Sequence, residues 1–488
     1  MSAFEKNNQA LFALFGSDAL AQRLLTTRIG IQSSDSRVSA KLLGTILADC
    51  LARLWPNIDF QGDLGGEQLQ VAQAAAKSGS MSDAGLKVAW DGSYDVVLQI
   101  GECSAQASPY VLRVAADGWM AYLGPEGDCS DDGNPVGPAC AAALAAAQVF
   151  RHVFQLELAD LEPQVVDRLA FDVRSICDMP DLAVDDLSLE GTVVMGTGAV
   201  THSLLWILEK WPRQVSGTID LVDPDPYGSS NGQRYAFMPP FTGKLMKVDA
   251  ARGRLRAAHP GLEITPHAVD LNAYCQVRGY ELPIFRAITG LDSPEARRQA
   301  ALKLPQRTIN LWTDEHRCGG SRYVPDGDAA CLACDYLENT IATMDEAAEF
   351  QLETGLQPQE VRHLLDSSAH LTQEQAATVA RHRGVSVDKL IDMPIRSIRP
   401  VLCASATVQV GQEATAADVP FAFSSLMAGV SGFMMLLADL RGALGSAGWN
   451  QHVFKAPSRF MHSPRYMQAE CARCGLIHFQ ADVEEVAA

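Results

Sequence analysis

A group of polar side chains between residues 223 and 247 has the chemistry needed to hold a polyphosphate. Asp223 and Asp225 are followed by Asn231, Arg234 and then Lys247. The arginine and the lysine can neutralise phosphate oxygens through charge-assisted hydrogen bonds. A carboxylate at the end of a strand can hold the hydroxyl groups of a ribose. These residue types, in this order, therefore indicate a site for a nucleotide with several phosphates.

The segment ahead of these side chains can bring the backbone close to the same phosphates. Residues 192–195 read as a short buried strand, and Gly196 and Gly198 follow in the pattern Gly-x-Gly-x-x-Thr. Glycines at the start of a helix let backbone N–H groups approach a phosphate. The glycines alone would also suit a dehydrogenase, and Thr201 stands where a third glycine would. The asparagine, arginine and lysine that follow favour instead a nucleotide whose α-phosphate is attacked.

The surrounding elements have the order of a βαβ unit. Residues 203–211 carry apolar side chains at helical spacing, and residues 217–222 form a second strand that ends at Asp223.

Two Cys-x-x-Cys pairs indicate a metal site. Cys331 and Cys334 form the first pair, and Cys471 and Cys474 form the second. Zinc favours four thiolates in a tetrahedron, and a closed shell of four cysteines is structural rather than catalytic. A redox pair is the alternative, but neither pair opens a helix after a strand as redox motifs do. We therefore predict a structural zinc site.

Together these motifs resemble the adenylating domain of the ThiF/MoeB and ubiquitin-activating enzyme superfamily, over residues 189–334 and 399–475. The resemblance implies an α/β fold of two Rossmann-like, ThiF-type halves packed as a pseudo-dimer, with the second half catalytic. It implies that ATP and the C-terminal glycine of a ubiquitin-like protein give an acyl-adenylate and pyrophosphate. Arg234 and Lys247 would neutralise the phosphates, and Asp292 would hold Mg²⁺. Asp292 could instead cap a helix, because Asp-Ser-Pro-Glu also opens a helix well.

The resemblance also places a cysteine that would take the acyl group as a thioester. Cys403 lies after a predicted helical insertion and before the last apolar segment, which fits that position. A buried structural role is the alternative, since free cysteine is among the most buried residues, and Cys318 is a competing thiol. The activated modifier would then pass to a conjugating enzyme. Related enzymes also receive an arginine from an N-terminal helix, but Arg23, Arg28 and Arg37 match no motif.

The expected domain organisation has an inactive copy before the active one. Residues 27–32, 33–37 and 38–54 read as strand, turn and helix, but the turn lacks Gly-x-Gly and would approach a phosphate poorly. The expected divisions are an inactive Rossmann-like domain (1–160), a linker (161–188), the active adenylation domain (189–334), a helical insertion (335–398) and a return to the active domain (399–488).

Composition limits the classes of partner. The chain has 488 residues with 39 basic and 58 acidic side chains, a net charge of −19, which argues against nucleic-acid binding. The apolar stretch 419–438 is interrupted by glycines, serines and Pro420, so we expect a buried helix rather than a membrane span. We expect a cytoplasmic protein with reduced thiols, either monomeric or a homodimer.

Two other functions fit parts of the pattern. A sulfur-carrier or peptide adenylyltransferase would share the nucleotide site without a thioester step. A non-catalytic Rossmann-like scaffold would need neither Arg234 and Lys247 nor Asp292, so their presence argues against it.

Overall fold

The computed structural model describes residues 19–62, 65–79, 90, 92–104, 108–159, 162–228, 231–236, 238, 245–279, 283–314, 316–326, 328–337, 350–351, 354–367, 369–383, 386–393, 395, 398, 421–457, 463–468, 471 and 473–474. The chain divides into two compact units. The smaller one comprises residues 337–417 with Met1, and the larger one comprises residues 2–336 and 418–488. Each unit is described by itself.

The larger unit begins with a six-stranded sheet in the order β2-β1-β3-β4-β5-β6. The strands β1 to β4 are parallel and β5 and β6 are antiparallel, and the predicted first strand, turn and helix are confirmed. One expectation is corrected: β6 lies in the segment assigned to the linker but pairs with β5. The elements are β1 (Arg28–Ser33), β2 (Asn57–Gly62), β3 (Val96–Ile100), β4 (Tyr110–Asp117), β5 (Met120–Leu123), β6 (Leu169–Asp172), α2 (Ala19–Thr26), α3 (Val38–Ala52), α4 (Gly65–Gly79), α5 (Val136–Val153) and the 3₁₀ helix η2 (Val173–Ile176).

The second sheet of this unit has the order β10-β9-β8-β11-β12-β13-β14-β15, with β7 paired to β9. The strands from β10 to β12 are parallel, and the last three are antiparallel. The chain runs from β8 outward to β10 and then returns to β11 on the other side of β8. Ligands of such sheets bind outside the carboxyl ends of the strands at this switch point. The strands are β7 (Leu187–Ser188), β8 (Thr192–Met195), β9 (Val215–Val222), β10 (Leu262–His267), β11 (Arg286–Thr289), β12 (Arg307–Thr313), β13 (Arg317–Tyr323), β14 (Ser446–His452) and β15 (Ser463–Arg465).

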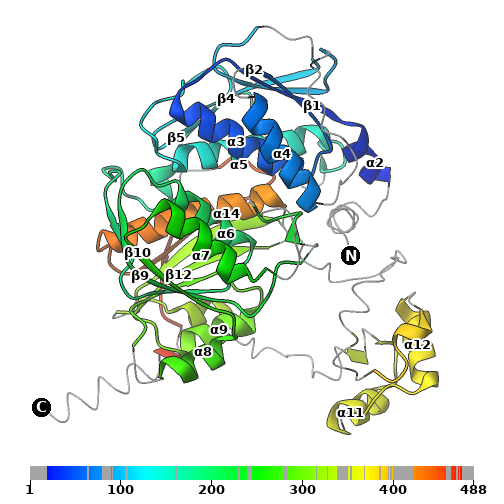
Figure 1. Ribbon diagram of the computed structural model, residues 1–488. Coiled ribbons are helices and arrows are strands. Elements are labelled where there is room, and N and C mark those ends of the chain that lie inside the picture. Colours follow the sequence, from blue (N-terminus) through cyan, green and yellow to red (C-terminus); the bar gives the residue numbers. More distant parts are fainter. Residues whose placement is uncertain are drawn as a thin grey trace, which may run out of the picture. The chain divides into compact units, whose positions relative to one another are not determined.

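The long apolar helix α14 (Ala422–Leu440) is buried and packs against α5, α6, β12 and β13. It lies between the N-terminal helices and the second sheet in Figure 1. Glycines allow the close approach, because a Cβ on Gly429 would lie 2.4 Å from the Cβ of Ser203. Among the described residues, α14 is long and apolar enough to cross a membrane, yet it is enclosed by protein, as the interrupted sequence predicted. The other helices are α6 (Ala199–Glu209), α7 (Lys247–Ala258), α8 (Leu271–Arg278), α9 (Pro294–Leu302) and the 3₁₀ helix η4 (Leu332–Tyr336).

The smaller unit is helical, as expected. It contains α11 (Pro358–Ser367), α12 (Gln373–Arg383) and the short η5 (Val387–Lys389) around its own apolar core. Thr372 begins α12 with a capping box: its hydroxyl accepts from the Gln375 N–H at 3.3 Å, and the Gln375 side chain accepts from the Thr372 N–H at 3.0 Å.

Candidate functional site

The loop from Gly196 to Gly198 joins β8 to α6 at the switch point. Gly196 has φ +84°, and a Cβ there would lie 3.0 Å from the carbonyl oxygen of Gly290. Gly198 is the N-cap of α6, and a Cβ on it would lie 3.4 Å from the same oxygen. Gly196 therefore favours glycine, both for its backbone angle and for the tight contact, whereas a Cβ on Gly198 would make an ordinary van der Waals contact. The loop presents the N-terminus of α6, which suits an anion.

Asp223 shapes this loop from the end of β9. One oxygen of its buried carboxylate accepts from the N–H of Thr197 at 2.7 Å and from its hydroxyl at 3.0 Å. The other oxygen accepts from the backbone N–H of Asp225 at 2.9 Å. Asp225 has a side chain 64% exposed, so it is the more accessible of the two carboxylates. The ribose contact predicted for this pair stays a prediction.

Lys247 is the first residue of α7 and points back to the same two carboxylates. Its ammonium lies 2.8 Å from Asp225 and 3.6 Å from Asp223, and the residue is only 6% exposed. Burial alone would lower the pKa of Lys247, but the neighbouring Tyr235, Asp223 and Asp225 raise it above its usual value. The lysine therefore stays charged, next to the glycine loop, at neutral pH.

Asn231 and Arg234 lie on one turn between β9 and α7. The side-chain carbonyl of Asn231 accepts from the Gly228 N–H at 2.7 Å, so it also stabilises the turn. Behind the turn the buried His202 contacts the hydroxyl of Tyr227. Burial lowers the pKa of His202 to about 3, so its ring is neutral at physiological pH. The turn thus packs beside uncharged aromatic side chains, and the predicted cation Arg234 is half-buried on this turn.

The structure adds one arginine that no motif indicated. Arg53, after the end of α3 in the N-terminal half, donates to the carbonyl oxygen of Gly232 at 2.5 Å. Its guanidinium is fully buried and pairs with Asp49 at 2.7 Å. The sequence did contain a sign of this contact: Asp49 and Arg53 are opposite charges four residues apart in an apolar helix, a pattern that indicates a buried ion pair.

The three arginines considered from the sequence make other contacts. Arg23 pairs with Glu157, Arg28 lies 3.1 Å from Asp59, and Arg37 lies 2.6 Å from Asp35.

Asp292 follows β11 and is exposed beside the switch point. It does not cap α9: the hydroxyl of Ser293 does, accepting from the Ala296 N–H at 3.1 Å. The helix-cap interpretation of Asp292 is therefore wrong. Thr201, which replaces the third glycine, is fully buried against Gly290. Binding of Mg²⁺ by Asp292 stays a prediction.

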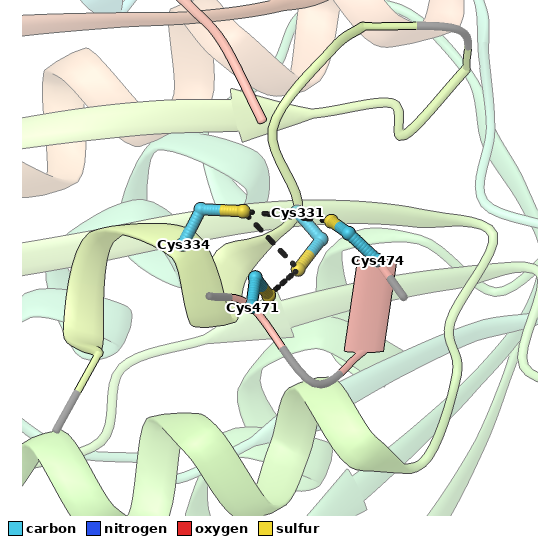
Figure 2. A group of neighbouring side chains, drawn as sticks. All are labelled: Cys331, Cys334, Cys471 and Cys474. Carbon is cyan, nitrogen blue, oxygen red and sulfur yellow. Dashed lines mark hydrogen bonds between the residues drawn. The ribbon is translucent and has the colours of Figure 1, made fainter. Parts of the chain in front are cut away.

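The four predicted zinc ligands come together. The sulfur atoms are 3.8 Å apart between Cys331 and Cys334, 3.5 Å between Cys331 and Cys471, and 3.5 Å between Cys334 and Cys474. Figure 2 shows all four side chains turned toward one point. A tetrahedron with Zn–S bonds of about 2.3 Å would place its sulfur atoms about 3.8 Å apart. All four are buried, so the cluster fits a closed structural zinc site.

The thioester prediction cannot be placed in the same way, because Cys403 lies outside the described residues. The competing thiol can be assessed. Cys318 is buried, and burial raises its pKa far above the usual thiol value, which makes it a poor nucleophile. Among the described cysteines, Cys103 is the one that is not buried.

One family model matches a segment within the N-terminal part of the chain. Residues 65–161 match the family described as the BilD N-terminal domain. The chain is also similar to the uncharacterized protein y4jF of Sinorhizobium fredii, with 30% identity over 346 residues. That match covers 67% of this chain and 64% of the relative, so the chain spans somewhat less than two thirds of that protein's length.

Solved structures of MccB from E. coli are similar at a greater distance. A complex of MccB with MccA-N7isoASN is 10% identical with a TM-score of 0.34, covering 75% of this chain and 97% of that chain. The microcin C7 biosynthetic enzyme MccB in complex with N-formylated MccA is 12% identical with a TM-score of 0.34, covering 75% and 98%. Similarity this distant says nothing about the substrate of this chain.

Proposed function

We propose that this chain is an ATP-dependent adenylating enzyme of the ThiF/MoeB and ubiquitin-activating superfamily. The supporting observation is the position of Lys247, buried beside the glycine loop and within 3.6 Å of both Asp223 and Asp225. Lys247 thus meets carboxylates 22 and 24 positions before it in the sequence, where an open α/β sheet binds its ligand. Asp223 and Asp225 already pair the charge of Lys247, so its burial alone does not separate an enzyme from a scaffold. What favours the enzyme is the place of this charge, at the carboxyl ends of the strands where such a sheet binds its ligand.

The reaction proposed is attack of a carboxylate oxygen on the α-phosphorus of ATP. The new P–O bond forms as the bond to the bridging oxygen breaks, and pyrophosphate leaves; no proton has to move. Two anions approach each other, so the barrier is largely electrostatic. Lys247 and Arg234 supply positive charge, and the backbone at Gly198 supplies N–H groups. A magnesium ion held by Asp292 would screen the leaving pyrophosphate.

The proposed acyl substrate is the C-terminal glycine of a ubiquitin-like protein. The Cys403 thiolate would then attack the acyl carbonyl, AMP would leave, and the thioester would pass to a conjugating enzyme. Support comes from the N-terminal half, whose sheet carries no glycine loop but whose core is continuous with that of the second sheet. The proposal includes a cytoplasmic location, where thiols stay reduced.

The test is ATP–pyrophosphate exchange driven by a candidate ubiquitin-like protein that ends in glycine. Arg234→Ala should lower the exchange rate by about 10²–10³-fold, because it removes positive charge aimed at the developing phosphate charge. Arg256→Ala is the matched control, since Arg256 is an exposed arginine on α7 away from the strand ends. Equal rates for the two variants would contradict the site. An absence of both exchange and ATP binding in the wild type would refute the proposal.

The thioester step has its own readout. Cys403→Ala should leave exchange intact and abolish a thiol-sensitive adduct with the modifier, whereas Cys103→Ala should keep both. Exchange without any adduct in the wild type would favour a sulfur-carrier or peptide adenylyltransferase.

A further inference from the structure

A line of hydrogen-bonded polar side chains runs from the turn of the first cysteine pair toward the glycine loop between β8 and α6. The hydroxyl of Thr289, the last residue of β11, donates to the side-chain oxygen of Asn310 at 2.9 Å. The amide nitrogen of Asn310, on β12, donates to the hydroxyl of Tyr336 at 3.1 Å. Thr289 and Asn310 are both fully buried. Tyr336 closes η4, the turn that carries Cys334, so the line begins at the zinc site.

At its other end, this line of side chains reaches the loop after β11, which packs against the glycine loop. Thr289 is followed by Gly290, whose N–H donates to the Met195 carbonyl at 3.1 Å and whose carbonyl lies over Gly196. Asp292 comes two residues later, at the carboxyl end of the same strand. A shift of Thr289 would therefore move Gly290 and Asp292 together, relative to the loop between β8 and α6.

The position of Tyr336 is set on several sides. The guanidinium of Arg297 lies over its ring, 5.0 Å from the centroid, and Arg298 donates to its carbonyl oxygen at 3.1 Å. Both arginines belong to α9, the helix that starts just after Asp292. The second cysteine pair contacts the other end of α9. Arg473, which lies between the two cysteines of that pair, donates to the carbonyl oxygen of Ala301 at 3.0 Å.

We propose that Tyr336 is a positioning residue for nucleotide binding, acting through Asn310 and Thr289 on the Gly290–Asp292 loop. In this view the zinc site has a second role besides holding the C-terminal segment. It positions the carboxylate of Asp292, which would bind the magnesium ion of the nucleotide. The inference rests on the proposed ATP site but not on the identity of the acyl substrate.

The test uses the full-length, zinc-loaded chain and measures ATP binding by calorimetry over a series of MgCl₂ concentrations. Tyr336→Phe removes only the hydroxyl that meets Asn310, and it should raise the Mg²⁺ concentration for half-maximal ATP binding about fivefold, a typical coupling between residues of one network. Tyr323→Phe is the matched control. Tyr323 is buried, Tyr336 is half-buried, and the hydroxyl of Tyr323 donates to Asp335 on the same turn rather than meeting Asn310. That variant should shift the concentration less than twofold, and both should keep their zinc.

Variants at the other end guard against a simple effect on folding of the cysteine turn. Thr289→Val should raise the Mg²⁺ concentration for half-maximal ATP binding by a similar factor without altering that turn. Thr289→Ser keeps a hydroxyl and should retain the wild-type value. In an Asp292→Asn background the effect of Tyr336→Phe should disappear. Identical Mg²⁺ curves for Tyr336→Phe and Tyr323→Phe, or a shift that persists without Asp292, would overturn the inference. Wild-type protein that binds no ATP would instead overturn the proposed function.

Discussion

Single atoms decide the geometry around the nucleotide loop. The threonine that replaces the third glycine of the pattern, Thr201, is compensated by Gly290 opposite it. A Cβ on Gly290 would lie 2.0 Å from the Thr201 hydroxyl oxygen and 3.1 Å from Val200. The departure from the glycine pattern at position 201 is thus possible because a glycine stands across from it.

Gly290→Ala tests this pairing. The new methyl group should displace the loop, destabilise the fold by about 1–3 kcal/mol as overpacking does, and weaken ATP binding at least about tenfold. Calorimetry with Mg·ATP and urea unfolding would measure the two effects. Gly253→Ala is the control, because a Cβ on that α7 glycine meets nothing within 4 Å and should stabilise the helix slightly. Adding Thr201→Ala to Gly290→Ala should recover much of the lost affinity; unchanged binding by Gly290→Ala would show that the loop tolerates the methyl group.

At the scale of elements, the turn that carries Asn231 and Arg234 is held from the other half of the molecule. Arg53 reaches it from the end of α3, and the Asp49–Arg53 pair is enclosed by apolar helices. The N-terminal half lacks a glycine loop of its own, so its contribution is to support the turn of the active half.

Arg53→Ala should cost about 3–5 kcal/mol of unfolding free energy, because it removes the guanidinium that pairs with the buried Asp49 carboxylate. Urea unfolding would measure this loss. The double variant Asp49→Leu with Arg53→Met removes both charges and should recover most of the stability. It should not recover ATP affinity, because the hydrogen bond from Arg53 to the Gly232 carbonyl oxygen is still missing. Full recovery of ATP binding in the double variant would mean that Arg53 serves stability alone.

At the scale of the whole larger unit, the cluster of four cysteines joins two segments that lie 140 residues apart in the sequence. The residues of the smaller unit come between them in the sequence. Metal binding to such a site is also folding free energy, since the ligands are not gathered in the unfolded chain. Four thiolates are needed, so affinity falls as pH falls and the thiols become protonated.

Metal analysis should find one zinc ion per chain, lost on treatment with a strong chelator. Removal of zinc should lower the melting temperature by at least about 5 °C, which corresponds to about 4 kcal/mol in a unit of this size. Cys474→Ser should have the same effect without a chelator, and Cys103→Ser, at a thiol outside the cluster, should have none. Zinc-free protein that melts like the untreated chain would refute a structural role.

Much of this organisation was determined by local sequence. The strands at 28–33, 192–195 and 215–222 and the helix α14 follow from short-range apolar patterns, which depend on neighbours along the chain. The residues of the candidate nucleotide site and the four clustered cysteines could be named because glycines, carboxylates and paired cysteines carry their chemistry at fixed spacing.

The tertiary structure alone decided which of these residues meet and what supports them. Sheet order places β11 beside β8, so Gly290 faces Gly196 across nearly a hundred residues of sequence. The Gly232 contact of Arg53 and the line from Thr289 through Asn310 to Tyr336 join separate elements, and no local pattern encodes them. Their physical reason is burial: a polar group removed from water must find a partner wherever the fold brings one.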